Sequence, residues 1–272
     1  MGLIASLKSK AGMSKSEDHW NSESSAGEKE GHGGGASSSS SSFLPTSTLD
    51  VHAIGYDTNQ ALTGKTLENI TVYRADSGQA EYVSVRRKRS SNSCALVRAS
   101  DPDRTLISTI YRVGPGRHPK MHILPANARV TVDAALLADK AVPGEEVTVR
   151  SRSLTSRAQV LDTAAHGKFQ WRYGGHEERR AAGDGVDSLL VMERSKDGAR
   201  VAQLVRSAEL RTPGTVRYSG GNGGRLMVDL HGWENDDKAG AADMEAFVVA
   251  SCILMLKREA DRFIDNNIAA VV

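Results

Sequence analysis

Residues 247–256 read FVVASCILML, an apolar run interrupted by a single Ser. The segment around it, from about residue 241 to residue 264, contains neither Gly nor Pro, so nothing in it breaks a helix. We therefore predict a helix of several turns over 241–264. Charged residues near its two ends match the helix macrodipole, with acids first and bases last: Asp243, Glu245, Lys257, Arg258 and Arg262.

The predicted helix is apolar on every face rather than along one stripe. A helix of this kind has to be surrounded on all sides, which a closed sheet can do. The apolar run over 246–256 is much shorter than the roughly 20 residues that span a bilayer. The sequence thus favours a buried core helix and no transmembrane segment.

The chain before this helix is typical of antiparallel strands. Short runs rich in Val, Ile, Thr and Tyr alternate with turn residues, and residues 81–86 and 169–173 alternate polar with apolar side chains. We therefore predict a mainly β, antiparallel barrel or sandwich. The ten clearest strands are 70–74, 82–86, 95–99, 105–113, 129–134, 146–150, 169–173, 188–193, 200–205 and 225–230.

The composition indicates one folded domain behind a tail. Residues 1–45 are rich in Ser and Gly and predict a disordered tail, whereas residues 46–272 carry the apolar material for one core. The formal net charge of +2 gives no whole-protein field that would attract nucleic acid. No secretory signal pattern begins the sequence, so we expect a cytoplasmic protein whose Cys94 and Cys252 are free thiols.

Strands followed by a wholly apolar C-terminal helix resemble the tubby C-terminal-like superfamily, which includes tubby proteins, phospholipid scramblases and LURP-one-related proteins. The resemblance spans roughly residues 48–265 and is nearest to fungal members of the group. It is carried by four ordered segments: FQWR at 169–172, VAQLV at 201–205, GNGGRL at 221–226 and VVASCILMLKRE at 248–259. It implies a closed barrel of about 12 strands threaded by the helix, and phosphoinositide binding of the kind that tubby shows. No residues match the tubby lipid site one by one.

The first residues suit a membrane anchor. Met1 to Ser6 fit the N-myristoylation pattern with Gly2 as the acceptor. Because one acyl chain binds membranes only marginally, a stable anchor needs a second signal, which an apolar face and basic residues would supply. The alternative is an inert tail. The predicted membrane-contact residues are Leu3, Ile4, Leu7, Lys8, Lys10 and Lys15.

Two basic clusters are candidate sites for an anionic ligand. The first, Arg86, Arg87, Lys88 and Arg89, ends a predicted strand, and the second consists of Arg117 and Lys120 in a loop. The first cluster also suits a solvated hairpin tip, and the small net charge favours that interpretation.

Other motifs carry little chemistry. His118 and His122 have the spacing of helical zinc ligands, but Pro119 interrupts any helix, so we expect no metal. The remaining histidines and both cysteines are scattered and form no catalytic motif, so we expect no cofactor and no catalytic residue. The glycines of 220–224 suit a hairpin turn, or less readily a close approach of the backbone to a ligand.

The sequence thus predicts a non-catalytic peripheral membrane or adaptor module at the inner face of the plasma membrane, binding anionic phospholipid head groups. Three alternatives remain open: a protein-interaction scaffold, a scramblase-like lipid transporter, and an enzyme that uses the barrel mouth. A transporter of that kind would need acylated cysteines or a membrane-embedded segment, and an enzyme would need a deep pocket lined by titratable groups.

Overall fold

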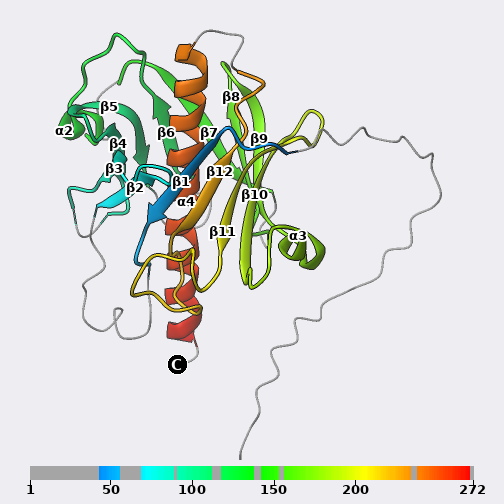
Figure 1. Cartoon of the computed structure of the whole chain (residues 1–272). Coiled ribbons are helices and arrows are strands. Elements are labelled where there is room, and N and C mark those ends of the chain that lie inside the picture. Colours follow the sequence, from blue (N-terminus) through cyan, green and yellow to red (C-terminus); the bar gives the residue numbers. More distant parts are fainter. Residues whose placement is uncertain are drawn as a thin grey trace, which may run out of the picture. The chain divides into compact units, whose positions relative to one another are not determined.

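A computed structural model describes residues 43–55, 69–88, 91–111, 118–137, 142–152, 156–233 and 238–269. Within this part, twelve antiparallel strands pair with their neighbours in sequence, and β1 pairs with β12 to close a barrel (Figure 1). The strands are β1 (Ser47–His52), β2 (Ile70–Arg74), β3 (Ala80–Val85), β4 (Cys94–Arg98), β5 (Asp101–Ile110), β6 (Lys120–Ile123), β7 (Glu145–Ser151), β8 (Gln159–Thr163), β9 (Gly167–Tyr173), β10 (Ser188–Arg194), β11 (Arg200–Arg206) and β12 (Gly224–Val228).

The last helix, α4 (Lys238–Ala269), runs lengthwise through the barrel (Figure 1). Every residue from 244 to 257 is buried, as expected for a helix with no polar face. Inward-facing side chains of the strands, such as Phe169, Leu190 and Leu204, pack around it with no exposed surface. The predicted fold class, a mainly β closed barrel around a buried C-terminal helix, is therefore confirmed.

The one polar residue inside the apolar run has hydrogen-bond partners. The Ser251 hydroxyl accepts a hydrogen bond from the Trp171 indole N–H at 2.9 Å and donates one to the Val248 carbonyl at 3.0 Å. Because a buried polar group without a partner would cost about 1 to 3 kcal/mol, this pairing allows Ser251 to lie in the core. Trp171 therefore packs against the central helix.

The predicted strand over 129–134 is wrong. These residues lead into a short helix, α2 (Val132–Ala135), because the Thr131 hydroxyl caps it by accepting a hydrogen bond from the Ala134 N–H at 3.3 Å. Val132 packs on Ala95 and Val97, which form a cluster separate from the main core. The helix therefore covers part of the barrel wall and adds no strand.

Three strands were not predicted from the sequence: β1, β6 and β8. A third helix, α3 (His176–Ala181), lies against the outside of the barrel beside β10 (Figure 1). No helix of the described ranges has the length and apolar character needed to cross a bilayer.

Candidate functional site

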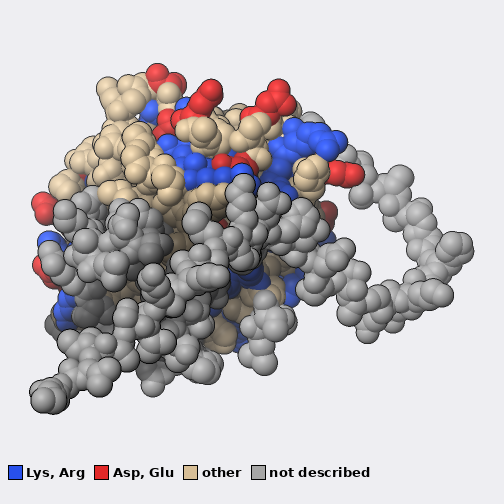
Figure 2. Space-filling model, turned by 90° about the horizontal axis from the view of Figure 1, so that it is seen from below, with Lys and Arg blue, Asp and Glu red and all other residues tan. Residues whose placement is uncertain are grey.

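Since α4 fills the barrel, space for a ligand remains at the barrel ends. Two cavities flank the C-terminal turns of α4, at the lower end of Figure 1, and Gly221 lines both. We call this end the mouth. Figure 2 shows the molecule from this side, where blue Lys and Arg side chains lie interspersed with red Asp and Glu over the described surface.

The larger cavity has a volume of about 410 Å³ and is rich in guanidinium groups. Arg206 comes from the end of β11, Arg262 from α4, and Arg157 from the segment before β8. Glu259 is the only acidic residue among the described residues that line it. Because Arg stays protonated in proteins, the lining carries three positive charges against one negative charge.

Arg206 is the most firmly held of the three cations. Its side chain is 6% exposed, and one terminal nitrogen donates to Glu259 Oε1 at 2.9 Å while the other donates to Asn222 Oδ1 at 3.1 Å. Burial alone would lower the pKa of Arg206, but the Glu259 carboxylate outweighs that effect, so the pKa lies above its ordinary value. The guanidinium is thus charged and fixed in orientation.

Tyr173 completes this cluster. Its hydroxyl donates to Glu259 Oε1 at 2.6 Å, and the Arg157 guanidinium lies 5.9 Å from the centre of its ring. Burial, followed by the Glu259 charge, raises the pKa of Tyr173, so the phenol stays protonated at neutral pH. Tyr173 is thus tied to α4 through Glu259.

The Arg206–Glu259 pair is only partly satisfied. Among the described residues, neither Arg206 Nε nor Glu259 Oε2 has a hydrogen-bond partner, although both atoms are buried. Because buried polar atoms are nearly always paired, these two atoms have hydrogen-bonding capacity left for a water molecule or a ligand in the adjoining cavity.

The smaller cavity, of about 80 Å³, lies on the other side of Gly221. Its lining includes Arg86 and Lys257. None of the described residues that line it is acidic. Lys257 is 8% exposed, and its ammonium donates to the Asn92 carbonyl at 2.8 Å. The Asn92 side chain in turn donates to Asp261 at 2.9 Å, which ties this wall to α4.

Glycines allow the wall between the two cavities to approach α4. A Cβ on Gly220 would lie 2.5 Å from Phe263 Cβ, and one on Gly221 would lie 2.3 Å from the Leu256 carbonyl oxygen. Gly221 also has φ of 77°, which favours glycine. The hairpin turn predicted here is wrong, because β11 ends at Arg206 and residues 207–223 form a long connection. The backbone at Gly220 and Gly221 does make a close approach, and the element that it approaches is α4.

The described members of the first predicted basic cluster have different surroundings. Arg86 lines the smaller cavity and its side chain donates to the Ser91 carbonyl, whereas Arg87 pairs with Asp133 at 2.9 Å on the surface. Lys88 is exposed. Arg89 lies outside the described residues. Of the three described members of this cluster, only Arg86 lines a cavity of the mouth.

Of the second predicted cluster, the structure describes Lys120. Lys120 pairs with Glu146 at 2.9 Å, and His122 lies 3.7 Å from the same carboxylate. Arg117 falls outside the described residues. The described ranges contain no group of His, Cys, Asp or Glu that could hold a metal ion.

The predicted lipidation and membrane-contact residues also fall outside the described residues: Gly2, Leu3, Ile4, Leu7, Lys8, Lys10 and Lys15. Both cysteines are free, as predicted, and both are buried. Burial raises the pKa of the Cys252 thiol to about 12, so this thiol is unreactive at neutral pH in the folded chain.

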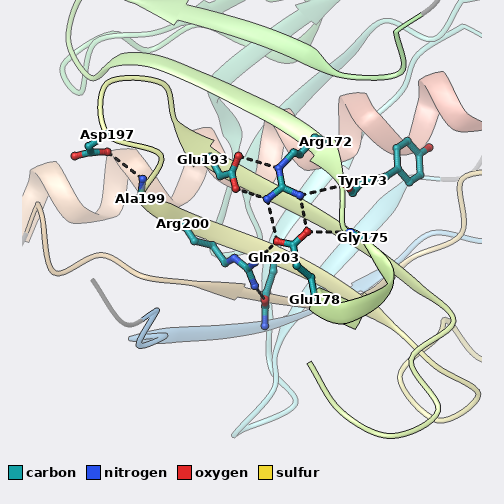
Figure 3. Close-up of polar contacts among 9 residues, drawn as sticks. All are labelled: Arg172, Tyr173, Gly175, Glu178, Glu193, Asp197, Ala199, Arg200 and Gln203. Atoms are coloured by element: carbon teal, nitrogen blue, oxygen red, sulfur yellow. Dashed lines mark hydrogen bonds and ion pairs between the residues drawn. The ribbon is translucent and has the colours of Figure 1, made fainter. Parts of the chain in front are cut away.

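On the outer wall of the barrel, by contrast with the mouth, a network of ion pairs has partners for all of its charged groups (Figure 3). Arg172 contacts the carboxylates of both Glu178 and Glu193, and Glu178 also accepts from Arg200. Arg200 donates its other terminal nitrogen to Gln203 at 2.9 Å. These bonds tie α3 to the barrel, and each charged group already has a partner of opposite charge.

Near the opposite end of α4, Glu245 is fully hydrogen-bonded. Glu245 accepts two hydrogen bonds from Arg74, at 2.9 and 2.7 Å, and one from the Tyr82 hydroxyl at 2.7 Å. Because α4 begins at Lys238, Glu245 lies beyond its first turn, and its pairing with Arg74 explains the residue better than the predicted match to the macrodipole.

The fold therefore defines a mainly β protein with a closed antiparallel barrel, a central helix and a cationic mouth. No family model, curated protein or solved structure matches this chain.

Proposed function

We propose that this chain is a non-catalytic binding module that takes phosphorylated, anionic groups into the larger cavity at the mouth. The observation that carries the proposal is the excess of three guanidiniums over one carboxylate in a cavity of about 410 Å³. Guanidinium groups bind phosphate through paired, charge-assisted hydrogen bonds. Because Glu259 and Asn222 already hold the Arg206 side chain, it would lose little conformational entropy when a ligand binds, which favours affinity.

The same cavity gives little support to acid–base catalysis. The raised pKa of Tyr173 keeps the phenol protonated at neutral pH, and Glu259 is already engaged by Arg206. A general acid or base works best with a pKa near the working pH. These side chains are therefore better suited to holding a charged group than to moving protons.

We further propose that the chain belongs to the tubby C-terminal-like group and works at the cytoplasmic face of a membrane. A twelve-stranded barrel around a C-terminal helix has the architecture that the sequence resemblance implies. In this proposal the ligand is the head group of an anionic phospholipid, and acylation of Gly2 with Lys8, Lys10 and Lys15 supplies a further contact.

Calorimetric titration of the full chain with inositol trisphosphate tests the binding proposal, with uncharged inositol as the control ligand. We expect Arg157→Gln/Arg262→Gln to weaken binding by at least about tenfold, since a hydrogen bond to a charged group contributes about 1.5 to 3 kcal/mol. The matched double variant Arg150→Gln/Lys168→Gln removes two exposed positive charges of the barrel wall and should change affinity less than about twofold. Equal losses in both variants, or no binding by the wild type, would refute the proposal.

A further inference from the structure

An exposed apolar turn stands at the edge of the mouth. Val216 is 53% exposed and Tyr218 is 76% exposed, although both are large apolar or aromatic residues. Arg217 lies between them, with its guanidinium 5.9 Å from the centre of the Tyr218 ring. Tyr218 is the most exposed large hydrophobic residue of the described ranges.

The turn is tied directly to the larger cavity. The Ser219 N–H donates to the Val216 carbonyl at 3.0 Å, and Ser219 itself lines the cavity. The Asn222 side chain donates to the same carbonyl at 3.2 Å while its oxygen accepts from Arg206. The position of the turn is therefore coupled through one amide to the buried guanidinium.

A third exposed apolar residue lies on the same rim. Ile54 is 39% exposed and lines the smaller cavity. Its neighbour Gly55 packs so closely on the connection before β12 that a Cβ there would lie 2.5 Å from the Gly220 carbonyl oxygen. In Figure 1 this connection, in yellow, runs beside the last turns of α4.

These apolar residues are concentrated at the mouth. Five large hydrophobic residues of the described ranges are exposed. Ile54 lines the smaller cavity, and Val216 and Tyr218 come just before Ser219, which lines the larger one. Of the other two, Leu44 lines a separate cavity of about 370 Å³, and Leu137 lines none of these three cavities. The rim thus combines apolar side chains with basic cavities on one end of the barrel.

We propose that this rim rests on an anionic lipid bilayer, with Val216 and Tyr218 entering the interfacial layer while the larger cavity takes a lipid head group. The inference rests on the proposed function and adds the surface that docks. Tyr partitions to the membrane interface because its ring is apolar and its hydroxyl is polar, and basic residues beside it are attracted to anionic lipids. If the rim docked on a protein instead, the charge of the lipids would not change the fraction of the chain bound to vesicles.

The test is flotation of the unacylated full chain, made in bacteria, with vesicles of phosphatidylcholine alone or with added phosphatidylserine and a phosphoinositide. We expect the wild type to float with the anionic vesicles only. Val216→Ser/Tyr218→Ser should reduce the bound fraction about tenfold, because two apolar side chains no longer enter the interface. Leu44→Ser/Leu137→Ser, the matched control, should float like the wild type.

Binding of soluble inositol trisphosphate to the same variants separates the two proposals. We expect Val216→Ser/Tyr218→Ser to bind the soluble ligand as the wild type does, which also shows that it is folded. Equal flotation of this variant and the wild type overturns the docking inference, as does a wild type that binds the soluble ligand but ignores the vesicles. A wild type that binds neither overturns the proposed function as well.

Discussion

The two ends of α4 carry the same three residue types in different states. At one end Glu245 meets Arg74 and Tyr82, and at the other Glu259 meets Arg206 and Tyr173. The two carboxylates lie roughly 20 Å apart, at about 1.5 Å of rise per residue. Each cluster joins a glutamate of the helix to an arginine and a tyrosine of the wall, so both clusters fix the helix in the barrel.

The difference between the two clusters lies in their unused hydrogen-bonding capacity. Both oxygens of Glu245 are bonded, and Arg74 also donates to Glu81 at 3.1 Å. In the other cluster Glu259 Oε2 and Arg206 Nε lack partners within the described part of the chain, and an open cavity adjoins the pair. The saturated cluster therefore serves stability, whereas the incomplete cluster beside a cavity is where we expect binding.

The largest expected effect concerns stability. Glu245→Ala should lower the free energy of unfolding by about 3 kcal/mol, because it leaves Arg74 and the buried Tyr82 hydroxyl without their acceptor. Glu259→Ala should cost less, about 1 to 2 kcal/mol, since water in the adjoining cavity can solvate the groups left behind. Urea unfolding followed by circular dichroism measures both. A larger loss of unfolding free energy for Glu259→Ala than for Glu245→Ala would show that the incomplete cluster contributes more to stability, contrary to this prediction.

A smaller effect on stability is expected at the outer wall, where the ion-pair network of Glu178 is saturated like the Glu245 cluster. Hydrogen bonding by Arg172 lowers the pKa of Glu178 from 4.5 to about 2. A carboxyl whose pKa is depressed on folding stabilises the protein fully above its ordinary pKa, and this contribution is lost as the pH falls toward the folded value. The stability difference between wild type and Glu178→Gln should therefore be constant from pH 7 to about pH 5 and shrink toward pH 2.

Unfolding curves at several pH values measure this difference. A difference that persists unchanged at pH 2 would show that Glu178 contributes through its shape and not through its charge. The matched variant Glu177→Gln alters the neighbouring exposed carboxyl of the same helix turn and is the control for removing one negative charge from this helix.

Much of the fold follows from the sequence because its signals are local. The all-round apolar helix and nine of the ten predicted strands agree with the structure. The tenth failed because Thr131 caps a helix turn that tertiary packing on Ala95 and Val97 stabilises. Among the missed strands, β8 turns Gln159 and Thr163 inward, so its alternation does not look apolar, and β6 is only four residues long.

The mouth could not be read from local patterns, because its residues meet only in three dimensions. Arg206 and Glu259 come from β11 and α4, and Arg157 lies in an irregular segment. One signal was present: Arg206 continues the inward parity of Ala202 and Leu204, so the strand pattern places a cation in the core. Density of basic residues, which pointed to Arg86 and its neighbours, is a weaker guide than a charge at an inward position.

The most direct test of the central claim is a titration of the ¹⁵N-labelled full chain with inositol trisphosphate, followed through the Arg Nε–Hε resonances and assigned by single Arg→Lys variants. The resonances of Arg157, Arg206 and Arg262 should move with the ligand, while that of Arg74, in the saturated cluster, stays in place. Movement of Arg74 to the same extent, or stationary resonances for all three residues of the mouth at saturating ligand, would contradict the account.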